Sequence, residues 1–265
     1  MSVNKPIGVF DAGIGSYAIV EKIRKSYPSQ DIVYLADRKS FPYGAKDHGE
    51  LLTVTRQATE YLFQYGCSAV VLASNAPSIV VMEDLLKLAS LPVIGVLPPV
   101  KEACRHSMTR NIAVLGVRSM VESPEFKKYV IENTLEGCAI SGINASELVD
   151  LVEDFSFLND HEKTQRVVSQ FLEKQLETQP NIDVMTMSST HLPWLKAFFL
   201  QAQPQITFLD PADSVIEEIR PYVTHGDGII DCIATESPQF PIKTFNEALL
   251  GLKTGLIAKL IHIGN

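Results

Sequence analysis

Cysteine is scarce in this sequence, and the few that occur form no recognisable disulfide or metal motif. Only four are present among 265 residues. They are Cys67, Cys104, Cys138 and Cys232. No pair has C-x-x-C spacing, which argues against a zinc ribbon, a redox motif and a disulfide-stapled secreted domain. We therefore predict four reduced thiols that act as small buried apolar groups in a cytoplasmic protein.

Long apolar runs and clusters of positive charge are also absent. No apolar segment approaches the roughly 20 residues that a membrane-spanning helix needs, and the N-terminus lacks the features of a signal peptide. Asp and Glu outnumber Lys and Arg by 31 to 23, so the formal net charge is -8. No basic stretch carries interleaved aromatic residues. We therefore expect neither a membrane partner nor a nucleic-acid partner.

A complete dinucleotide-binding fingerprint is missing too. Gly13 and Gly15 lie in a turn between an apolar segment at residues 7–10 and a helical pattern, but the third glycine of the fingerprint is not there. Such a turn can still hold an anion on its backbone N–H groups. An oxidoreductase or a phosphate-binding Rossmann enzyme is thus poorly supported, and we expect no cofactor and no metal ion.

The acidic residue after that first apolar segment has two open interpretations. Asp11 would lie at a strand end, where it could act as a catalytic or amine-binding carboxylate. It could equally cap the helix that follows the glycine turn.

What the sequence does contain is a regular alternation of strand-like and helical segments. The content of 46% hydrophobic and 20% charged residues is that of an ordinary globular protein, and the length allows one or two domains. Strands are predicted at residues 7–10, 31–37, 70–73, 91–97, 111–116, 138–143, 183–187, 205–209 and 228–234. Helices are predicted at residues 49–65, 160–176 and 244–263, among others, with a loop at residues 117–122. This alternation predicts an α/β fold with mostly parallel sheets.

Two of these strands end in a polar turn that carries a serine. The run at residues 70–73 leads directly into Ser74 and Asn75, and Pro77 then opens a helical pattern. The strand at residues 183–187 leads into Ser188, Ser189, Thr190 and His191 in the same way. Because ligands of open α/β sheets collect at the carboxyl ends of strands, we expect Ser74 and Ser189 to mark a binding or catalytic site.

Five short motifs, in order along the chain, together resemble glutamate racemases of the aspartate/glutamate racemase superfamily. They are Phe10–Gly15 (FDAGIG), Tyr34–Asp37 (YLAD), Phe41–Gly44 (FPYG), Ala73–Asn75 (ASN) and Ser189–Pro193 (STHLP). The resemblance covers nearly the whole chain, including the acidic residues 147–153 and the segment 209–211. Each motif alone is weak evidence, but five in the same order are strong.

The resemblance implies two pseudo-symmetric, doubly wound α/β domains that face a central cleft. One domain would comprise residues 1–97 plus 210–265, and the other residues 98–209. The double proline at Pro98 and Pro99 agrees with the first of these boundaries. Ser74 and Ser189 would then face each other across the cleft.

The family racemises glutamate without a cofactor, using one cysteine on each face of the substrate to move the α-proton. By motif, the two cysteines fall on Ser74 and Ser189, and the assisting acids and histidine fall on Asp11, Glu153 and His191. The substrate-holding positions correspond to Ala12, Pro42, Tyr43, Gly44, Asn75, Ala76 and Thr190. The implied partner is glutamate or a similar dicarboxylate, the implied role is supply of peptidoglycan precursors, and a homodimer is compatible with the resemblance.

The chain departs from the family pattern at the positions that carry the chemistry. Both cysteines are serine, Ala12 stands where the family has serine, and Ala76 stands where it has threonine. Because the departures extend beyond the two serines, we interpret them as natural divergence. The acids at residues 147–154 could also be no more than a solvated helix face.

Two hypotheses follow. The chain is either an enzyme of the family that works through unusual bases, or a degenerate racemase that binds an amino acid or dicarboxylate and regulates a partner. A serine hydroxyl is a far weaker acid than a thiol, so we expect weak or absent racemisation.

Overall fold

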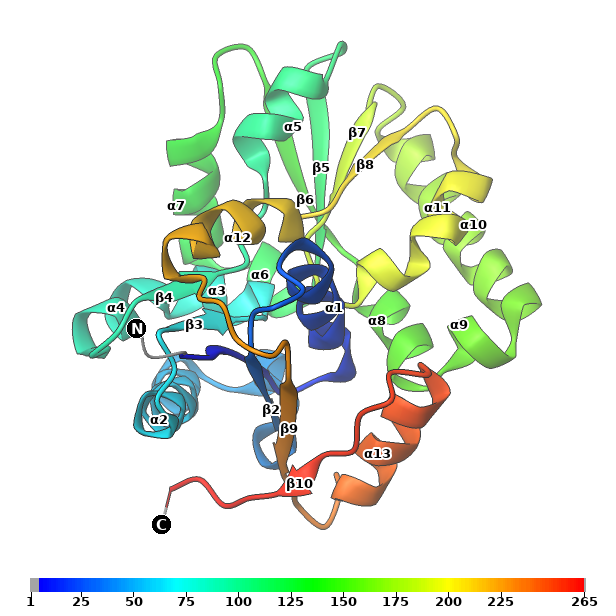
Figure 1. Cartoon of the computed structure of the whole chain (residues 1–265). Coiled ribbons are helices and arrows are strands. Elements are labelled where there is room, and N and C mark those ends of the chain that lie inside the picture. Colours follow the sequence, from blue (N-terminus) through cyan, green and yellow to red (C-terminus); the bar gives the residue numbers. More distant parts are fainter. Residues whose placement is uncertain (1–4, 265) are drawn as a thin grey trace. The chain divides into compact units, whose positions relative to one another are not determined.

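The computed structural model describes residues 5–264, which fold into two compact units (Figure 1). The first unit runs to Val96 and resumes at Ala212, and the second comprises Leu97–Pro211. The first unit is therefore built from two segments of the chain that are far apart in sequence.

The first unit contains a six-stranded sheet in which every neighbouring pair of strands is parallel. Its strand order is β10-β9-β2-β1-β3-β4. The strands are β1 Ile7–Asp11, β2 Ile32–Asp37, β3 Ala69–Leu72, β4 Val93–Gly95, β9 Ile230–Thr235 and β10 Lys259–Leu260. The α-helices are α1 Tyr17–Ser26, α2 His48–Tyr65, α3 Asn75–Val80, α4 Met82–Leu88, α12 Ala212–Ile219 and α13 Ile242–Gly251. The 3-10 helices are η1 Ile14–Ser16, η2 Arg38–Ser40, η3 Tyr43–Ala45 and η5 Arg220–Tyr222.

The second unit contains a four-stranded parallel sheet of order β6-β5-β7-β8. Its strands are β5 Asn111–Gly116, β6 Ala139–Asn144, β7 Val184–Met187 and β8 Thr207–Leu209. Its helices are α5 Val100–His106, α6 Arg118–Val121, α7 Pro124–Asn133, α8 Ser146–Glu153, α9 Ser156–Asn159, α10 His161–Thr178, η4 Leu192–Leu195 and α11 Lys196–Ala202.

The two sheets repeat one winding pattern. In the first unit the first four strands lie in the order β2-β1-β3-β4, and in the second the order is β6-β5-β7-β8. The strand before Ser74 (β3) and the strand before Ser189 (β7) are therefore equivalent in the two units. The predicted α/β class with parallel sheets is confirmed.

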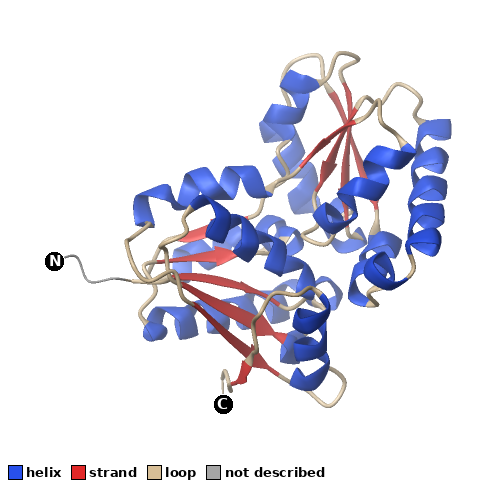
Figure 2. Ribbon diagram, turned by 45° about the vertical axis from the view of Figure 1, so that its right-hand side comes forward, coloured by secondary structure: helices blue, strands red, loops and turns tan. Residues whose placement is uncertain are grey.

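The strands of the first sheet are apolar because the sheet is covered on both sides. Every residue of β1, β2 and β3 is buried. Figure 2 shows helices on both faces of the sheets. A parallel sheet whose crossover helices lie on both faces leaves no face to water, so its strands read as continuous apolar runs.

Local sequence signals set several helix ends. Asp47 accepts a hydrogen bond from the Glu50 N–H (2.9 Å) at the start of α2, and Gly66 ends that helix with φ of +99°. The predicted start of a helix at Ser123 and Pro124 is confirmed, because the Ser123 hydroxyl accepts from the Phe126 N–H (3.0 Å).

Other predictions of local structure were wrong. Residues 117–122 are not simply a loop, since they contain α6. The last helix ends at Gly251 rather than near residue 263, because the backbone turns left-handed at Lys253 (φ +54°) and Gly255 (φ +74°). The chain then returns to the sheet as β10, the red strand of Figure 1. Of the four cysteines, Cys138 is half-buried while the others are buried.

A carboxylate clamp joins two loops of the second unit before β5 and β7. Asp183 accepts hydrogen bonds from the Ser107 hydroxyl (2.5 Å) and from the N–H groups of Met108 (2.7 Å) and Thr109 (2.9 Å). Burial raises the pKa of Asp183, but these hydrogen bonds outweigh it and hold the pKa below its ordinary value. A carboxyl whose pKa is lowered by folding stabilises the fold above its unfolded pKa, and this contribution is lost as the pH falls through the folded pKa.

We expect Asp183→Asn to lower the free energy of unfolding by about 1–2 kcal/mol at pH 7, a modest value because the carboxylate is partly exposed. The difference from the unmodified chain should shrink below about pH 4, where an ordinary carboxyl is protonated. Urea unfolding at several pH values measures it. Asp150→Asn is the control, because Asp150 is exposed on α8. An equal loss at pH 3 and pH 7 would contradict the clamp.

Candidate functional site

The carboxyl edge of the first sheet gathers several of the predicted residues. Asp11 is the last residue of β1, and the Ala73 N–H donates to the Phe10 carbonyl (2.8 Å), so Ser74 follows β3 beside the end of β1. The chain runs from β1 to β2 on one side of β1 and then to β3 on its other side. The carboxyl edge between β1 and β3 is therefore a topological switch point. Asp11 is 3% exposed and Ser74 is half-buried.

Asp11 lies just before the two helices that follow β1. The N-cap residue of η1 is Gly13 and that of α1 is Ser16, and neither of these residues caps its helix with its own side chain. Both interpretations of Asp11, as a functional carboxylate and as a cap of the following helix, stay predictions.

Asn75 presents a buried acceptor next to Ser74. Its amide Nδ2 donates to the Val96 carbonyl (2.8 Å), and a carbonyl can only accept, which assigns the amide nitrogen to that contact. The amide oxygen Oδ1 is buried and has no hydrogen-bond partner within residues 5–264. An unsatisfied buried acceptor costs about 1–3 kcal/mol. A donor from a bound molecule would remove that cost.

The loop that contains Pro42, Tyr43 and Gly44 is tied to the same edge. Tyr43 is buried, and its hydroxyl donates to Asp37 Oδ2 (3.1 Å), while Thr235 Oγ1 donates to Asp37 Oδ1 (2.8 Å). Burial, with Asp37 beside it, raises the pKa of Tyr43 well above its usual value, so the phenol stays a neutral donor. Pro42 and Gly44 on either side are exposed.

A buried arginine fixes the turn that follows β1. Arg38 Nη1 donates to the Ala12 carbonyl (2.7 Å), and its guanidinium lies 4.6 Å from the ring centre of Phe41 and 5.5 Å from that of Phe240. Cation–π contacts of this kind hold a planar guanidinium in place. The position of Ala12 is thus set by Arg38 of η2, which Phe240 of the C-terminal segment helps to hold in place.

The carboxyl edge of the second sheet carries a serine, a histidine and a glutamate in line. Ser189 Oγ lies 3.4 Å from His191 Nδ1, and His191 Nε2 lies 2.7 Å from Glu153 Oε1. Ser189 and His191 are 6% and 7% exposed, and the Glu153 side chain is 19% exposed. Glu153 is the last residue of α8, so a helix end supplies the carboxylate and the loop after β7 supplies the other two groups.

The contacts of His191 with Ser189 and Glu153 indicate which tautomer a neutral His191 adopts. A carboxylate can only accept, so a neutral His191 carries its proton on Nε2 and donates it to Glu153. Nδ1 then offers a lone pair to the Ser189 hydroxyl. The neighbouring hydroxyl is paired elsewhere, since Ser188 Oγ lies 2.8 Å from Thr186 Oγ1.

Each unit thus brings together part of the predicted set. Five of the predicted residues are buried in the first unit: Asp11, Ala12, Tyr43, Asn75 and Ala76. Ser189, Thr190 and His191 are buried in the second, with Glu153 beside them. The prediction that Ser74 and Ser189 face each other across a cleft stays a prediction.

Sequence reasoning missed two residues of the first unit that hold the site in place, Arg38 and Thr235. It placed Asp37 in a family motif but assigned it no role, although Asp37 ends a strand just as Asp11 does. Thr235 gave no local signal, since it lies 198 positions from Asp37 in the sequence.

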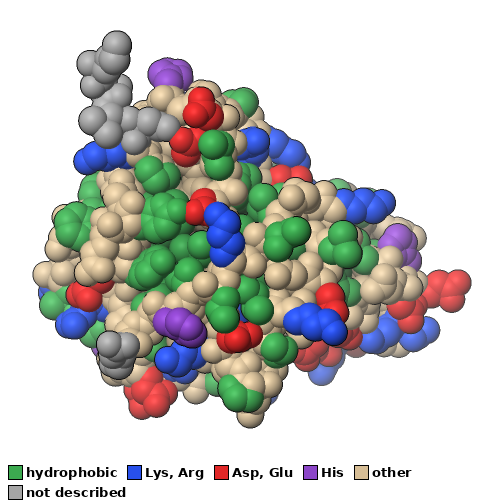
Figure 3. All heavy atoms as spheres, turned by 60° about the horizontal axis from the view of Figure 1, so that its bottom comes forward, with side chains coloured by type: hydrophobic (Ala, Val, Ile, Leu, Met, Phe, Trp, Pro, Cys, Tyr) green, Lys and Arg blue, Asp and Glu red, His purple; other side chains and the backbone are tan. Residues whose placement is uncertain are grey.

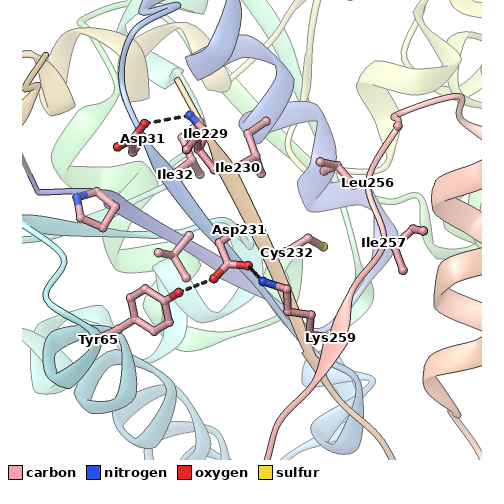
Figure 4. A pocket seen from close by; sticks show the side chains of 13 residues that line it. Asp31, Ile32, Tyr65, Ile229, Ile230, Asp231, Cys232, Leu256, Ile257 and Lys259 are labelled. Atoms are coloured by element: carbon pink, nitrogen blue, oxygen red, sulfur yellow. Dashed lines mark hydrogen bonds and ion pairs between the residues drawn. The ribbon is translucent and has the colours of Figure 1, made fainter. Parts of the chain in front are cut away.

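A pocket of about 530 Å³ lies at the other edge of the first sheet, near the start of β2 and β9 (Figure 4). Its polar groups are paired with each other. Asp231 accepts from the Tyr65 hydroxyl and from Lys259 Nζ (2.8 Å), and the bond to Asp231 raises the pKa of Tyr65 to about 12. No residue of the predicted site lines this pocket.

In residues 5–264, no three His, Cys, Asp or Glu side chains lie together as a metal ion would require. No described helix combines the length and apolar character needed to cross a membrane. On the face drawn in Figure 3, Lys and Arg are interspersed with Asp and Glu, and no broad basic area gathers among its described residues.

Comparison with known proteins agrees with the fold and the motifs. A sequence model of the Asp/Glu/Hydantoin racemase family matches residues 16–219. The glutamate racemase of Aquifex aeolicus (strain VF5) is 27% identical over 235 residues, or 88% of this chain and 89% of that protein.

Solved structures share the same fold. Escherichia coli glutamate racemase, in complex with L-glutamate and the activator UDP-MurNAc-ala, superposes with a TM-score of 0.84 at 21% identity over 98% of this chain and 100% of that one. Francisella tularensis glutamate racemase, in complex with D-glutamate, superposes with a TM-score of 0.79 at 20% identity over 98% of both chains.

These matches confirm the resemblance to glutamate racemases that the five motifs indicate. The family model spans well over half of the sequence. The chain belongs to the Asp/Glu/Hydantoin racemase family.

Proposed function

We propose that this chain binds glutamate or a similar dicarboxylic amino acid and racemises it weakly or not at all. The observation that carries the proposal is the pair of serines, Ser74 and Ser189, at equivalent strand ends of the two sheets. In this proposal they occupy the positions where the family has its two proton-transferring cysteines.

The size of the chemical penalty favours binding over turnover. Removal of an α-proton needs a base that is populated near neutral pH. A serine hydroxyl is about five pKa units less acidic than a thiol, so forming its conjugate base costs on the order of 7 kcal/mol more. That cost corresponds to a rate loss of about 10⁵ at each position.

The residues around the serines favour a ligand with both charged and hydrogen-bonding groups. Asp11 would bind the α-ammonium group, and the unpaired Asn75 Oδ1 would accept a hydrogen bond from one of its N–H groups. Tyr43 and Thr190 would complete the contacts, with Ala12, Ala76, Pro42 and Gly44 forming the wall. The E. coli and F. tularensis structures hold L- and D-glutamate, which supports this ligand class.

A second candidate function is a working racemase that supplies D-glutamate for peptidoglycan precursors. The Ser189–His191–Glu153 line favours it, because a histidine beside the hydroxyl provides a base at one face. The first candidate is preferred, since racemisation needs proton transfer at both faces.

Ligand binding is tested by isothermal titration calorimetry with L-glutamate, D-glutamate and aspartate. We expect the unmodified chain to bind at least one of them, and Asn75→Ala to weaken that binding by about tenfold or more, because a buried acceptor is worth about 1–3 kcal/mol. Asn133→Ala is the matched control, since Asn133 also donates Nδ2 to a backbone carbonyl, that of Tyr129 (2.8 Å), on α7.

Folding of both variants is checked by thermal unfolding. The proposal fails if none of the three amino acids binds at millimolar concentration. The proposed contact between Asn75 and the ligand is contradicted if a folded Asn75→Ala variant binds the amino acid as tightly as the unmodified chain.

A further inference from the structure

We propose that Ser189 is an activated nucleophile, with His191 as its general base and Glu153 as the positioning residue, and that it accepts the acyl group of small carboxylic esters. This activity is separate from the amino-acid binding proposed above and does not depend on it. Acyl transfer through a serine needs a hydroxyl, a base in contact with it, and a group that orients the base.

All three groups are in place and largely removed from water. The contacts are 3.4 Å from Ser189 Oγ to His191 Nδ1 and 2.7 Å from His191 Nε2 to Glu153 Oε1. The ring nitrogens are used in the opposite sense to those of the familiar serine protease triad, where Nε2 contacts the serine, but the roles are the same. Burial strengthens both interactions, because the local dielectric constant is low.

The protonation pattern matches what a general base requires. With its Nε2 proton donated to Glu153, a neutral His191 presents the Nδ1 lone pair to the Ser189 hydroxyl. When Nδ1 takes the hydroxyl proton, the ring becomes an imidazolium ion that contacts a carboxylate, which stabilises the charge. The carboxylate therefore orients the ring and favours the proton transfer.

Other serines lack one or more of these features. The Ser188 hydroxyl pairs with Thr186. Ser29 Oγ lies 3.3 Å from His225 Nδ1, but both residues are exposed, and in the part of the chain that is described no carboxylate contacts His225. Within those same residues the Ser74 hydroxyl has no histidine partner.

The reaction balances with water as the second reactant. Ser189 Oγ attacks the ester carbonyl carbon as His191 takes its proton, and the carbon–oxygen bond to the alcohol breaks as His191 returns that proton to the leaving oxygen. Water then attacks the acyl-serine with His191 as base. The products are a carboxylic acid, an alcohol and free Ser189, with no change of oxidation state.

The test is covalent labelling by diisopropyl fluorophosphate, which phosphorylates an activated serine oxygen and releases fluoride. We expect one adduct, on the peptide that contains Ser189, and a burst of p-nitrophenolate from p-nitrophenyl acetate equal to the enzyme concentration. Ser189→Ala should abolish both. His191→Gln should slow labelling by about 100-fold or more, the usual contribution of a general base.

Two matched controls separate this site from other serines. Ser188→Ala removes the adjacent hydroxyl, and Ser29→Ala removes the serine of the exposed Ser–His pair. Labelling should be unchanged in both variants. Circular dichroism and thermal unfolding establish that every variant is folded.

The pH dependence of the labelling rate tests the role of Glu153 in variants that stay folded. In the unmodified chain the labelling rate should rise with pH as His191 loses its proton. Glu153→Gln should move the midpoint to lower pH, because the carboxylate that stabilises the imidazolium is gone. A purely structural role for Glu153 would leave the midpoint in place.

The proposal is overturned if Ser189 takes no label, or if the label forms at the same rate in folded His191→Gln. Absence of glutamate binding together with labelling of Ser189 would defeat the proposed function and leave this inference standing. Glutamate binding without labelling of Ser189 would overturn this inference and leave the proposed function standing.

Discussion

Racemisation of glutamate by the unmodified chain should be at least about 10⁵-fold slower than by relatives with a thiol at the two serine positions. In the proposed function the two proton-transfer positions are Ser74 and Ser189, and both carry hydroxyls. An alkoxide would be a stronger base once formed, but that recovers only part of the loss, and the help that His191 gives to Ser189 acts at one face only. The loss should therefore persist in both directions of the reaction.

The most sensitive measurement is exchange of the glutamate α-proton in deuterium oxide, followed by NMR for L- and D-glutamate separately. The Ser74→Ala, Ser189→Ala double variant sets the background rate. Exchange at about 1–10³ s⁻¹, the range of ordinary enzymes, would mean that a base other than a thiol is working. Asp11 and His191 would then be the first residues to replace.

Restoring the two thiols should not by itself restore full activity. We expect Ser74→Cys with Ser189→Cys to stay weak, and the addition of Ala12→Ser and Ala76→Thr to raise turnover by a further 100-fold or so, because each lost hydrogen bond to a bound amino acid costs about 1–3 kcal/mol. Ala12 and Ala76 are both buried, so the hydroxyls would be held close to the strand ends. Coupled racemase assays of each variant measure the effect.

The control for this series is Ala12→Ser with Ala76→Thr in a chain that keeps both serines, which should remain as slow as the unmodified protein. Full turnover from the two cysteines alone would show that the surrounding residues had not diverged in function. It would place the whole loss of rate on the two sulfur-to-oxygen changes.

Much of the architecture was predictable because it depends on local patterns. The apolar runs of β1, β2 and β3 are fully buried, and such runs separated by amphipathic helices occur in parallel sheets. Ser123 and Pro124 begin α7 as their sequence indicates. The positions of Ser74 and Ser189 directly after strands follow from the same local rule.

Other features depended on contacts that no short segment contains. The last helix stops at Gly251, because the chain turns through left-handed conformations and then adds β10 to the edge of the sheet, beside β9. Amphipathic spacing alone predicts that the helix continues. A strand partner competes with the helix there, and that partner is supplied by the tertiary fold.

The candidate site shows the same division. The sequence by itself determined that Asp11 ends a strand and that Ser74 and Ser189 follow strands, because these are properties of residue type and local hydrophobic order. Only the tertiary structure decided that His191 contacts Glu153, 38 positions away, and that Thr235 contacts Asp37, 198 positions away. The physical reason is that a hydrogen bond acts over about 3 Å, so its partners are chosen by how strands and helices pack and not by their order in the chain.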